Sequence, residues 1–322
     1  ILRLLHLVSL SLPLFFSQSI FADLTIGPVP SDAPAGLSGV FSKHVDVLGL
    51  HVFAKSNVSD SRVLHCAHVL AQWIDNNEDG IPDDPVSHQE LVDRYASMVM
   101  WWNESQAEDE YDQIPDSTWD NYGFQDLFGN EVNLNYPNNS QFDPTLEETL
   151  HIVTHEGYAR VYPTVWGEYQ NTDISDAMDT NISNGWYHYN DWTCDYSCKL
   201  TEYVYWSITS ILGAQDYPWR AREIADEWEL YSSALVQKHD PPIWSIVTNP
   251  VWNLATVLPD GSYKPSLPCP ADLNGNGSVS VSDILIVLDA WGATNNPADI
   301  DGSGTVDVGD ILAIVEGWGD CP

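Results

Sequence analysis

The chain contains 322 residues, of which 11 are Lys or Arg and 47 are Asp or Glu, so its formal net charge is −36 at pH 7. A protein that binds nucleic acid or an anionic membrane surface needs clustered basic side chains, and this chain has too few to form a patch. The composition also excludes a disordered acidic tail, because 43% of the residues are hydrophobic and 14 are Trp, which is ample material for a core.

The N-terminal residues 1–22 form an apolar run that is interrupted only by Ser and Pro. The run has Arg3 near its start and ends with the small residue Ala22. This pattern is typical of a secretory signal peptide, and the run is too short for a membrane span. No later stretch reaches about 18 consecutive apolar residues. We therefore expect a secreted, extracellular protein with no membrane span.

The five cysteines fit an oxidising compartment. Cys194 and Cys198 lie in one short loop, and Cys269 and Cys321 bracket the C-terminal segment, so we expect each of these two pairs to form a disulfide. Cys66 lies inside an apolar helical pattern and is expected to be a buried, unreactive thiol.

The chain divides into a large domain at 23–258, a linker at 259–268 that is rich in Pro, Gly and Ser, and a small domain at 269–322. The large domain has helical apolar spacing in several segments and few period-two strand patterns, which predicts a mainly α fold with long acidic and aromatic loops. The expected helices lie at 61–74, 86–101, 144–161, 199–213 and 218–237.

An acidic loop follows the first of these helices. Asp75, Asn77, Asp79 and Asp83 occupy alternate positions around Gly80, a spacing that is similar to the calcium-binding acidic repeats of extracellular matrix proteins. The alternative is an acidic turn at the end of a helix, and the sequence leaves both interpretations open.

The helix expected at 144–161 carries a candidate metal site. His151 and His155 are separated by four residues and lie on one helical face, which is the geometry with which helices hold a transition metal. A third ligand has to come from elsewhere, and Glu202 lies in an expected helix that is apolar nearly all round, where a buried carboxylate needs a cation or a partner. We therefore expect a zinc site formed by His151, His155 and Glu202.

Neighbouring residues supply candidate catalytic groups for this site. Glu147 or Glu148 would take the proton of a zinc-activated water, and Tyr158 would polarise a substrate carbonyl. Simpler interpretations compete: Thr145 and Glu148 have the spacing of a capping box, the two histidines would then lie on a solvated face, and Glu202 would accept hydrogen bonds from aromatic side chains.

The C-terminal segment contains an internal repeat with a period of 27 residues, in which each copy is a loop rich in oxygen ligands followed by an apolar helix. The spacing places calcium ligands at alternate loop positions, with a Gly that permits the turn. In the first loop the expected ligands are Asp272, Asn274, Asn276, Ser278 through its carbonyl, Ser280 and Asp283. In the second loop they are Asp299, Asp301, Ser303, Thr305 through its carbonyl, Asp307 and Asp310. The first loop has two carboxylates against four in the second, so we expect it to bind calcium more weakly.

With these two loops, Asp at position 12 of both and a single helix after each, the segment 269–322 resembles a type I dockerin module. The resemblance implies a small all-α, EF-hand-like calcium-binding domain that docks onto a cohesin protein in a polysaccharide-degrading system. Cys269 and Cys321 would join the two ends of the module.

Three functions remain open. The first is a secreted metal-dependent hydrolase, most simply a peptidase, with a calcium-binding docking tail. The second is a polysaccharide-active or polysaccharide-binding protein that uses exposed Trp such as Trp101, Trp102, Trp186 or Trp192 to stack on sugar rings, with Glu147 or Glu148 in glycoside hydrolysis. The third is a non-catalytic surface protein stabilised by calcium.

Overall fold

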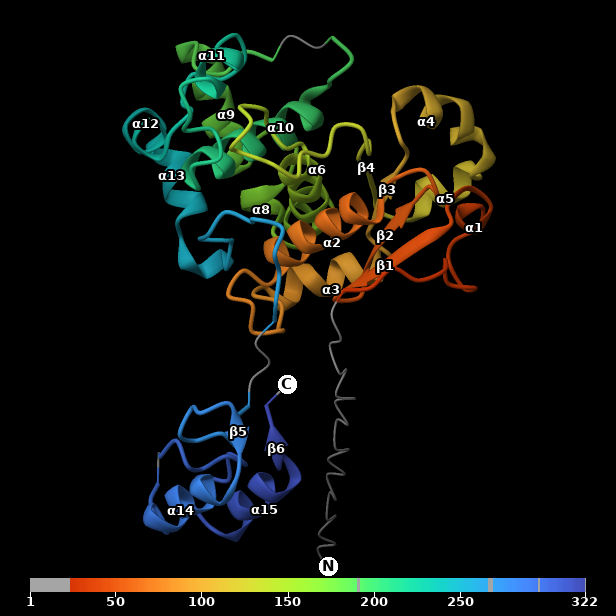
Figure 1. The fold of residues 1–322 in the computed structure, drawn as a ribbon. Coiled ribbons are helices and arrows are strands. Elements are labelled where there is room, and N and C mark those ends of the chain that lie inside the picture. The colour runs from red at the N-terminus through yellow and green to blue at the C-terminus, as the bar shows by residue number, and fades with distance from the viewer. Residues whose placement is uncertain (1–23, 190–191, 266–268, 295, 322) are drawn as a thin grey trace, which may run out of the picture.

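The computed structural model describes residues 24–189, 192–265, 269–294 and 296–321. The expected signal peptide at 1–22 therefore lies wholly outside the described residues. The large domain contains a four-stranded sheet beside a layer of helices (Figure 1). The strands are β1 Lys43–Val47, β2 Leu50–Ala54, β3 Ser97–Met100 and β4 Phe124–Asp126, in the spatial order β1-β2-β3-β4.

The sheet is mixed. Strands β1 and β2 are antiparallel and are joined by a two-residue turn at Leu48 and Gly49, whose φ angles are 54° and 85°. Two left-handed residues match the twist of a tight hairpin. Strands β2 and β3 are parallel, as are β3 and β4, so helices must carry the chain back between them.

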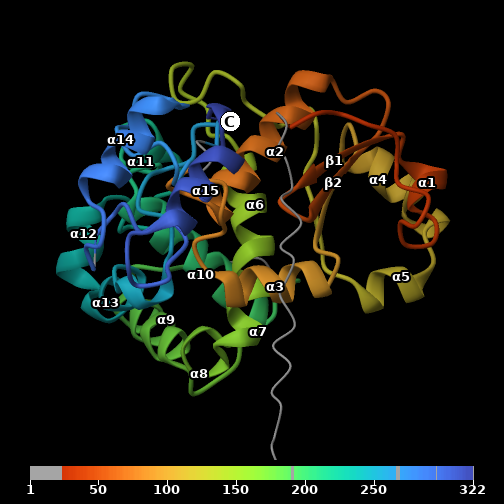
Figure 2. The same ribbon diagram turned by 90° about the horizontal axis from the view of Figure 1, so that it is seen from below.

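Side chains alternate across this sheet and build two cores. Val52, Met98 and Met100 pack into the main core with the helical layer, while Phe53 and Val99 point to a smaller cluster on the opposite face. In Figure 2, α4 and α5 lie on one side of β1 and β2, and α2 and α6 lie on the other. The sheet is therefore buried on both faces.

Helices dominate the rest of the large domain. Those in the first half are α1 Leu37–Val40, α2 Asp60–Ile74, α3 Pro85–Asp93, α4 Glu104–Glu110 and α5 Asp116–Asn121, with a 3-10 turn η1 at Tyr111–Gln113. Those in the second half are α6 Thr145–Ile152, α7 Ala159–Val161, α8 Pro163–Trp166, α9 Asp173–Asn184, α10 Tyr196–Ile211, α11 Arg220–Glu223, α12 Ser233–His239 and α13 Pro241–Val247, with a π-helix η2 at Val153–Tyr158 and a 3-10 turn η3 at Pro250–Trp252. The prediction of a helix-rich fold is confirmed, but the sheet was not foreseen.

Two expected helices are wrong in extent. The helix predicted at 86–101 ends at Asp93, and residues 97–100 form the buried strand β3. Tyr95 between them has a φ of 53°, a left-handed conformation that stops a helix. The helix predicted at 218–237 is two short helices, because the chain between them bends to form a bridge between Trp228 and Tyr187.

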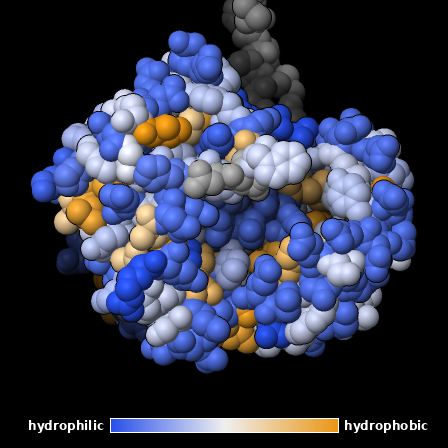
Figure 3. All heavy atoms as spheres, turned by 90° about the horizontal axis from the view of Figure 1, so that it is seen from above, coloured by the Kyte–Doolittle hydropathy of each residue, from blue (hydrophilic) through white to orange (hydrophobic). Residues whose placement is uncertain are grey.

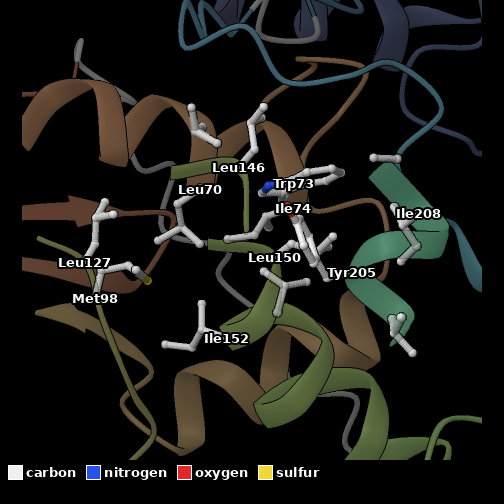
Figure 4. Packing of buried hydrophobic residues seen from close by; sticks show 14 of the residues in the cluster. Leu70, Trp73, Ile74, Met98, Leu127, Leu146, Leu150, Ile152, Tyr205 and Ile208 are labelled. Atoms are coloured by element: carbon white, nitrogen blue, oxygen red, sulfur yellow. The ribbon is translucent and has the colours of Figure 1, made fainter. Parts of the chain in front are cut away.

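Helices α6 and α10 pack against each other at the centre of the main core. Leu146 and Leu150 from α6 and Tyr205 and Ile208 from α10 are buried together, beside Leu70, Trp73 and Ile74 of α2 (Figure 4). The apolar stripe expected on the 144–161 helix is therefore a core face, and it sets how α6 is rotated about its axis.

The chain from 256 to 264 lies along the end of α2. The Gln72 side-chain carbonyl accepts the backbone N–H groups of Asp260 and Gly261 at 3.0 and 2.8 Å, and the Tyr263 hydroxyl donates to Asp75 at 2.7 Å. The first part of the linker expected at 259–268 is therefore bonded to the large domain, and residues 266–268 lie outside the described residues.

The C-terminal module consists of α14 Val281–Asp289, α15 Val308–Glu316 and a two-stranded antiparallel pair, β5 Ser278–Val279 and β6 Gly319–Asp320. The small strand pair is an addition to the all-α module that we expected. The six residues that form its core are Ala271, Val279, Val287, Ala298, Val306 and Ile314.

Both expected disulfides are present, Cys194–Cys198 within the large domain and Cys269–Cys321 between the ends of the module. Cys66 is a free, fully buried thiol whose pKa is raised by burial. Within the described residues, no helix combines the length and the apolar character that crossing a membrane requires.

A pair of histidines in the sheet makes stability depend on pH. The imidazole nitrogens of His44 and His51 are 3.0 Å apart, and burial, followed by the neighbouring His44, lowers the pKa of His51 to about 4. His51 of the unfolded chain binds a proton near pH 6.5, and His51 of the folded chain does not. The contribution of neutral His51 to the free energy of unfolding is therefore present above pH 6.5 and is lost as the pH falls toward 4. We expect His51→Gln to reduce the loss of unfolding free energy between pH 7.5 and 4.5 by about 2 kcal/mol. Urea unfolding of both proteins at the two pH values measures this, and equal losses would contradict it.

Candidate metal centre

The helix α6 begins without the capping box that the sequence allows. The Asp143 carboxylate accepts the Thr145 hydroxyl at 2.8 Å and the Thr145 backbone N–H at 3.2 Å, so Asp143 and not Thr145 provides the side-chain oxygen at the start of the helix. Glu148 is therefore free of the proposed reciprocal capping bond, and the cap interpretation of this residue is wrong. Asp143 itself also accepts a 2.6 Å hydrogen bond from His65 of α2, which ties the start of α6 to that helix.

Three side chains from α6 and α10 converge beneath the surface. One potential ligand atom from each of Glu147, His151 and Glu202 lies within 4.8 Å of the others. The His151 side chain is buried, and its Nε2 atom has no hydrogen-bond partner among the described residues although it lies 3.8 Å from Glu202 Oε2. An orphaned imidazole nitrogen between two carboxylates is the donor arrangement of a metal site.

Glu148 lies on the other side of the same imidazole. Its Oε2 atom is 3.6 Å from His151 Nδ1 and accepts a 2.6 Å hydrogen bond from Gln125. A carboxylate at Nδ1 favours the tautomer that leaves Nε2 as a lone-pair donor, as second carboxylates do for metal-binding histidines. The structure therefore places Glu148 behind His151 rather than in the expected position of a proton acceptor facing the substrate.

The carboxylates of this centre repel one another. Burial, followed by the charge of Glu148, raises the pKa of Glu147, and burial also raises the pKa of Glu202 above its ordinary value. Burial and the nearby Asp126 raise the pKa of Glu148 to about 8. All three shifts have the same physical origin, because too little positive charge is present for the negative charge that is buried. A bound cation would correct that imbalance.

The basic side chain of Arg220 is linked to this centre through the hydroxyl of Tyr205. Arg220 donates to the Tyr205 hydroxyl at 3.2 Å and to Gln215 at 2.8 Å, and Tyr205 in turn hydrogen-bonds Glu147. Sequence analysis did not single out Arg220 or Tyr205. Arg220 is one of only 11 basic residues in the chain, which could have drawn attention to it. The aromatic residues near it in the sequence gave no indication that it is buried.

His155 does not join the cluster, which corrects the predicted ligand set. The segment 153–158 is a π-helix, so each residue turns the chain by less than in an α-helix and His155 is rotated away from the direction that α-helical spacing predicts. Its Nδ1 atom forms a 2.5 Å hydrogen bond with Glu168. Glu147 takes its place beside His151 and Glu202.

Tyr158 also lies elsewhere. Its hydroxyl donates to the Trp252 carbonyl at 2.8 Å, and its ring is buried against Trp166. The predicted role of Tyr158 in polarising a substrate carbonyl is therefore wrong, because the hydroxyl is used in packing and does not line the cavity that His151 lines.

A cavity of about 430 Å³ opens beside the centre. Its lining includes both histidines and Glu202, and no Lys or Arg is among the described residues that line it. The lining residues are Phe124, Gln125, His151, His155, Glu156, Asp195, Ser197, Cys198, Thr201 and Glu202. From above, the surface of the molecule is hollowed, and the residues in the hollow are mainly hydrophilic (Figure 3). His151 and Glu202 therefore border a cavity that is large enough for a small ligand.

The second loop of the C-terminal module brings its acids together. Ligand atoms of Asp299, Asp301 and Asp310 lie within 4.8 Å of one another, and one oxygen of Asp299 has no partner among the described residues. Asp310 is fully buried and accepts backbone N–H bonds from Ile300 and Asp307. Ser303, Thr305 and Asp307 complete the loop around them.

The first loop has the same backbone pattern with fewer charges. The Asp272 carboxylate accepts the N–H groups of Asn276 and Gly277, as the Asp299 carboxylate accepts that of Gly304 in the second loop. The amide of Asn274 donates to Asp283 at 2.8 Å. The side chains of Asn276, Ser278 and Ser280 bond within the loop.

The acidic loop after α2 repeats this pattern. The Asp75 carboxylate accepts the N–H groups of Asp79 and Gly80, and Gly80 has a φ of 81°. Asp75 is already bonded to Tyr263, and Asp83 accepts the N–H of Asn76. These bonds satisfy the acids of the loop, so its geometry agrees with the acidic-turn interpretation that the sequence left open.

The four Trp residues that we expected to be exposed differ in environment. Trp101 is buried, which corrects that expectation, and Trp102 and Trp186 are partly covered by Arg62 and His239. The side chain of Trp192 is 92% exposed. The comparisons add no constraint on function: no family model, no curated protein and no solved structure matches this chain significantly.

Metal content distinguishes the observed cluster from the predicted one. We expect the full-length protein, dialysed against zinc with calcium in excess, to hold about one zinc ion per chain outside the calcium loops. Glu147→Gln and His151→Ala should lose that zinc because each removes a ligand atom, while His155→Gln should retain it. Elemental mass spectrometry gives the stoichiometry, and retention in Glu147→Gln with loss in His155→Gln would mean that the sequence-predicted ligand set is the real one.

Proposed function

We propose that the protein is an extracellular zinc-dependent hydrolase, most simply a peptidase, joined to a calcium-binding docking module. The observation that carries the proposal is the buried, unpartnered Nε2 atom of His151, which faces Glu147 and Glu202 at the wall of an open cavity. A structural metal site would be enclosed, whereas this cluster borders space in which a substrate fits.

Zinc fits the donor set better than the other common ions. One imidazole nitrogen and two carboxylate oxygens are borderline and hard donors, and calcium or magnesium would prefer oxygen donors alone. Three protein ligands leave a coordination position open, as catalytic zinc sites do. When bound, zinc supplies Lewis acidity and a water that loses its proton near neutral pH.

The remaining ionised groups suit a neutral or cationic substrate. The cavity lining has carboxylates at Glu156, Asp195 and Glu202, and no Lys or Arg is among the described residues that line it. Arg94 and Arg160 pair with Glu156 from outside this lining. A phosphate ester or another anionic substrate would be repelled by these groups and by the net charge of −36. A peptide bond carries no charge, which supports the peptidase assignment.

An extracellular location agrees with the cysteine chemistry. Both disulfides, Cys194–Cys198 and Cys269–Cys321, need an oxidising compartment to persist. Together with the signal peptide expected at 1–22, they support secretion.

The C-terminal module supports a protein partner. Four apolar residues in each repeat lie in matching positions 27 residues apart, and all are 49% to 62% exposed: Val281, Leu285, Leu288 and Trp291 in the first copy, and Val308, Leu312, Val315 and Trp318 in the second. Large exposed apolar side chains in a contiguous helical stripe mark interaction surfaces. This favours a docking role with a cohesin-like partner, as the resemblance to dockerins implies.

A polysaccharide substrate is the second candidate. The observation that favours it is Trp192, the 92% exposed Trp that lies two residues before Cys194 in the chain leading to α10. Against glycoside hydrolysis, the two carboxylates of the cluster, Glu147 and Glu202, lie together with the His151 imidazole, which suits a metal better than an acid and base pair. Binding to a glycan array that disappears in Trp192→Ala would support this candidate.

Removing the metal should abolish hydrolysis. We expect fluorescence-quenched peptides to be cleaved by the zinc-loaded protein, cleavage to stop on adding 1,10-phenanthroline, and zinc to restore it, because the proposed chemistry needs the ion. Glu202→Gln should not recover with zinc, and calcium kept in excess throughout controls for the C-terminal loops. Cleavage that persists without zinc would sink the assignment.

The two calcium loops should differ in affinity. The second loop supplies four carboxylates and the first supplies two, so the second should bind calcium at least roughly tenfold more tightly. Calorimetric titration of the full-length protein should lose its tighter step in Asp310→Asn and its weaker step in Asp283→Asn. The same change in both variants would contradict the assignment of the steps.

A further inference from the structure

The imidazole of His155 is held in the cavity wall by an anchored carboxylate. Its side chain is 45% exposed, and its Nδ1 atom lies 2.5 Å from Glu168 Oε2. Glu168 is largely buried and also accepts the hydroxyls of Ser197 at 3.0 Å and Thr201 at 2.8 Å. Three donors therefore fix the Glu168 carboxylate, and the carboxylate fixes the ring.

This arrangement leaves one nitrogen of His155 available. A carboxylate at Nδ1 holds the proton there, so the other ring nitrogen, Nε2, is the one that can take or give a proton. The nearest acid to Nε2 is Glu156 at 3.7 Å, which is too long for a hydrogen bond. Glu156 is itself paired with Arg94 at 3.1 Å and Arg160 at 2.8 Å, so its charge is already balanced.

Other titratable groups in the cavity are occupied. His151 and Glu202 belong to the proposed metal cluster. Asp195 accepts the N–H of Cys198 at the start of α10 and serves as the cap of that helix. Among the described residues that line the cavity, His155 is therefore the group that combines exposure, a fixed orientation and an available proton site.

The electrostatic environment agrees with this geometry. The hydrogen bond that His155 donates to Glu168 raises the pKa of His155, and burial only partly opposes the shift. The imidazolium is consequently easier to form near neutral pH than in a solvated histidine, which suits a group that must first accept a proton and then release it.

We propose that His155 is the proton-transfer residue of the hydrolase and that Glu168 is its positioning residue. The inference rests on the proposed function. The substrate class is a neutral peptide bond: an attacking water forms a bond to the carbonyl carbon while one of its protons moves to His155 Nε2. That proton then passes to the nitrogen of the leaving amine as the carbon–nitrogen bond breaks, so His155 ends as it began.

The π-helix gives this division of roles a structural cause. The histidines are four residues apart, but His151 belongs to α6 and faces α10, whereas His155 belongs to η2 and faces the chain before α9, where Glu168 lies. Both histidines line the cavity, but His151 also joins the cluster with Glu147 and Glu202, whereas His155 pairs with Glu168. Single π-helical turns within α-helices are frequent at functional sites.

Three variants of the zinc-loaded, full-length protein test the inference. His155→Gln removes proton transfer, Glu168→Gln removes the anchor, and His188→Gln is the matched control, since His188 is an exposed histidine bonded to the Gly185 carbonyl. With fluorescence-quenched peptides, we expect kcat/KM to fall about 100-fold or more in His155→Gln, with zinc content unchanged. His188→Gln should match the wild type.

The Glu168→Gln variant allows two measurements that would not change if Glu168 had only a structural role. Without the carboxylate the pKa of His155 should fall, so the acidic limb of the kcat/KM profile should shift to lower pH and the NMR titration of the His155 ring should shift with it. A reduced rate with an unchanged profile and an unchanged titration would overturn the positioning role of Glu168.

The outcomes separate the two proposals. A wild-type protein that binds zinc and cleaves no peptide overturns the hydrolase assignment and the role of His155 with it. A wild-type protein that cleaves peptides, with full activity in His155→Gln, overturns the role of His155 alone. If His155→Gln does not fold, modification of the wild type by diethyl pyrocarbonate replaces it, and activity that survives modification of His155, located by mass spectrometry, is the contrary result.

Discussion

The structure of the large domain is built around negative charge that is buried without enough positive charge to balance it. Glu147, His151 and Glu202 meet between α6 and α10, and Glu148 lies behind the imidazole. Burying ionised carboxylates is costly unless they are paired, and here the available cation, Arg220, acts through the hydroxyl of Tyr205. The metal ion that we propose would balance this charge, and the cavity lined by His151 and Glu202 would let a substrate reach it.

The apolar side of the two helices makes this centre possible. Leu146 and Leu150 pack into the core with Tyr205 and Ile208, which fixes how α6 and α10 are rotated against each other (Figure 4). Because the acids lie on the faces adjoining this packed stripe, the contact that buries the leucines also brings the ligand atoms together. The site is thus a consequence of core packing, and residues far from it, such as those of α2 beneath α6, hold it in place.

Prediction from the sequence succeeded where the signal was local. The helix at 61–74 and both disulfide pairs depend on residues near one another in the chain or at the two ends of an internal repeat, and the structure has them. Glu202 could be selected from the sequence because an acid in a helix that is apolar nearly all round needs a partner, whichever element that helix packs against. The four strands were missed because they are three to five residues long, and because β2 and β3 are buried on both faces and therefore show no alternating pattern.

The sequence by itself determined the acidic character of the chain, the C-terminal repeat and the presence of His151 and Glu202 in one candidate site. Only the tertiary structure decided that Glu147, and not His155, lies beside His151 and Glu202, that Tyr158 serves packing, and that His155 pairs with Glu168. The physical reason is that the π-helix and the contact between α6 and α10 are set by non-local packing. Spacing along an ideal α-helix cannot foresee either of them.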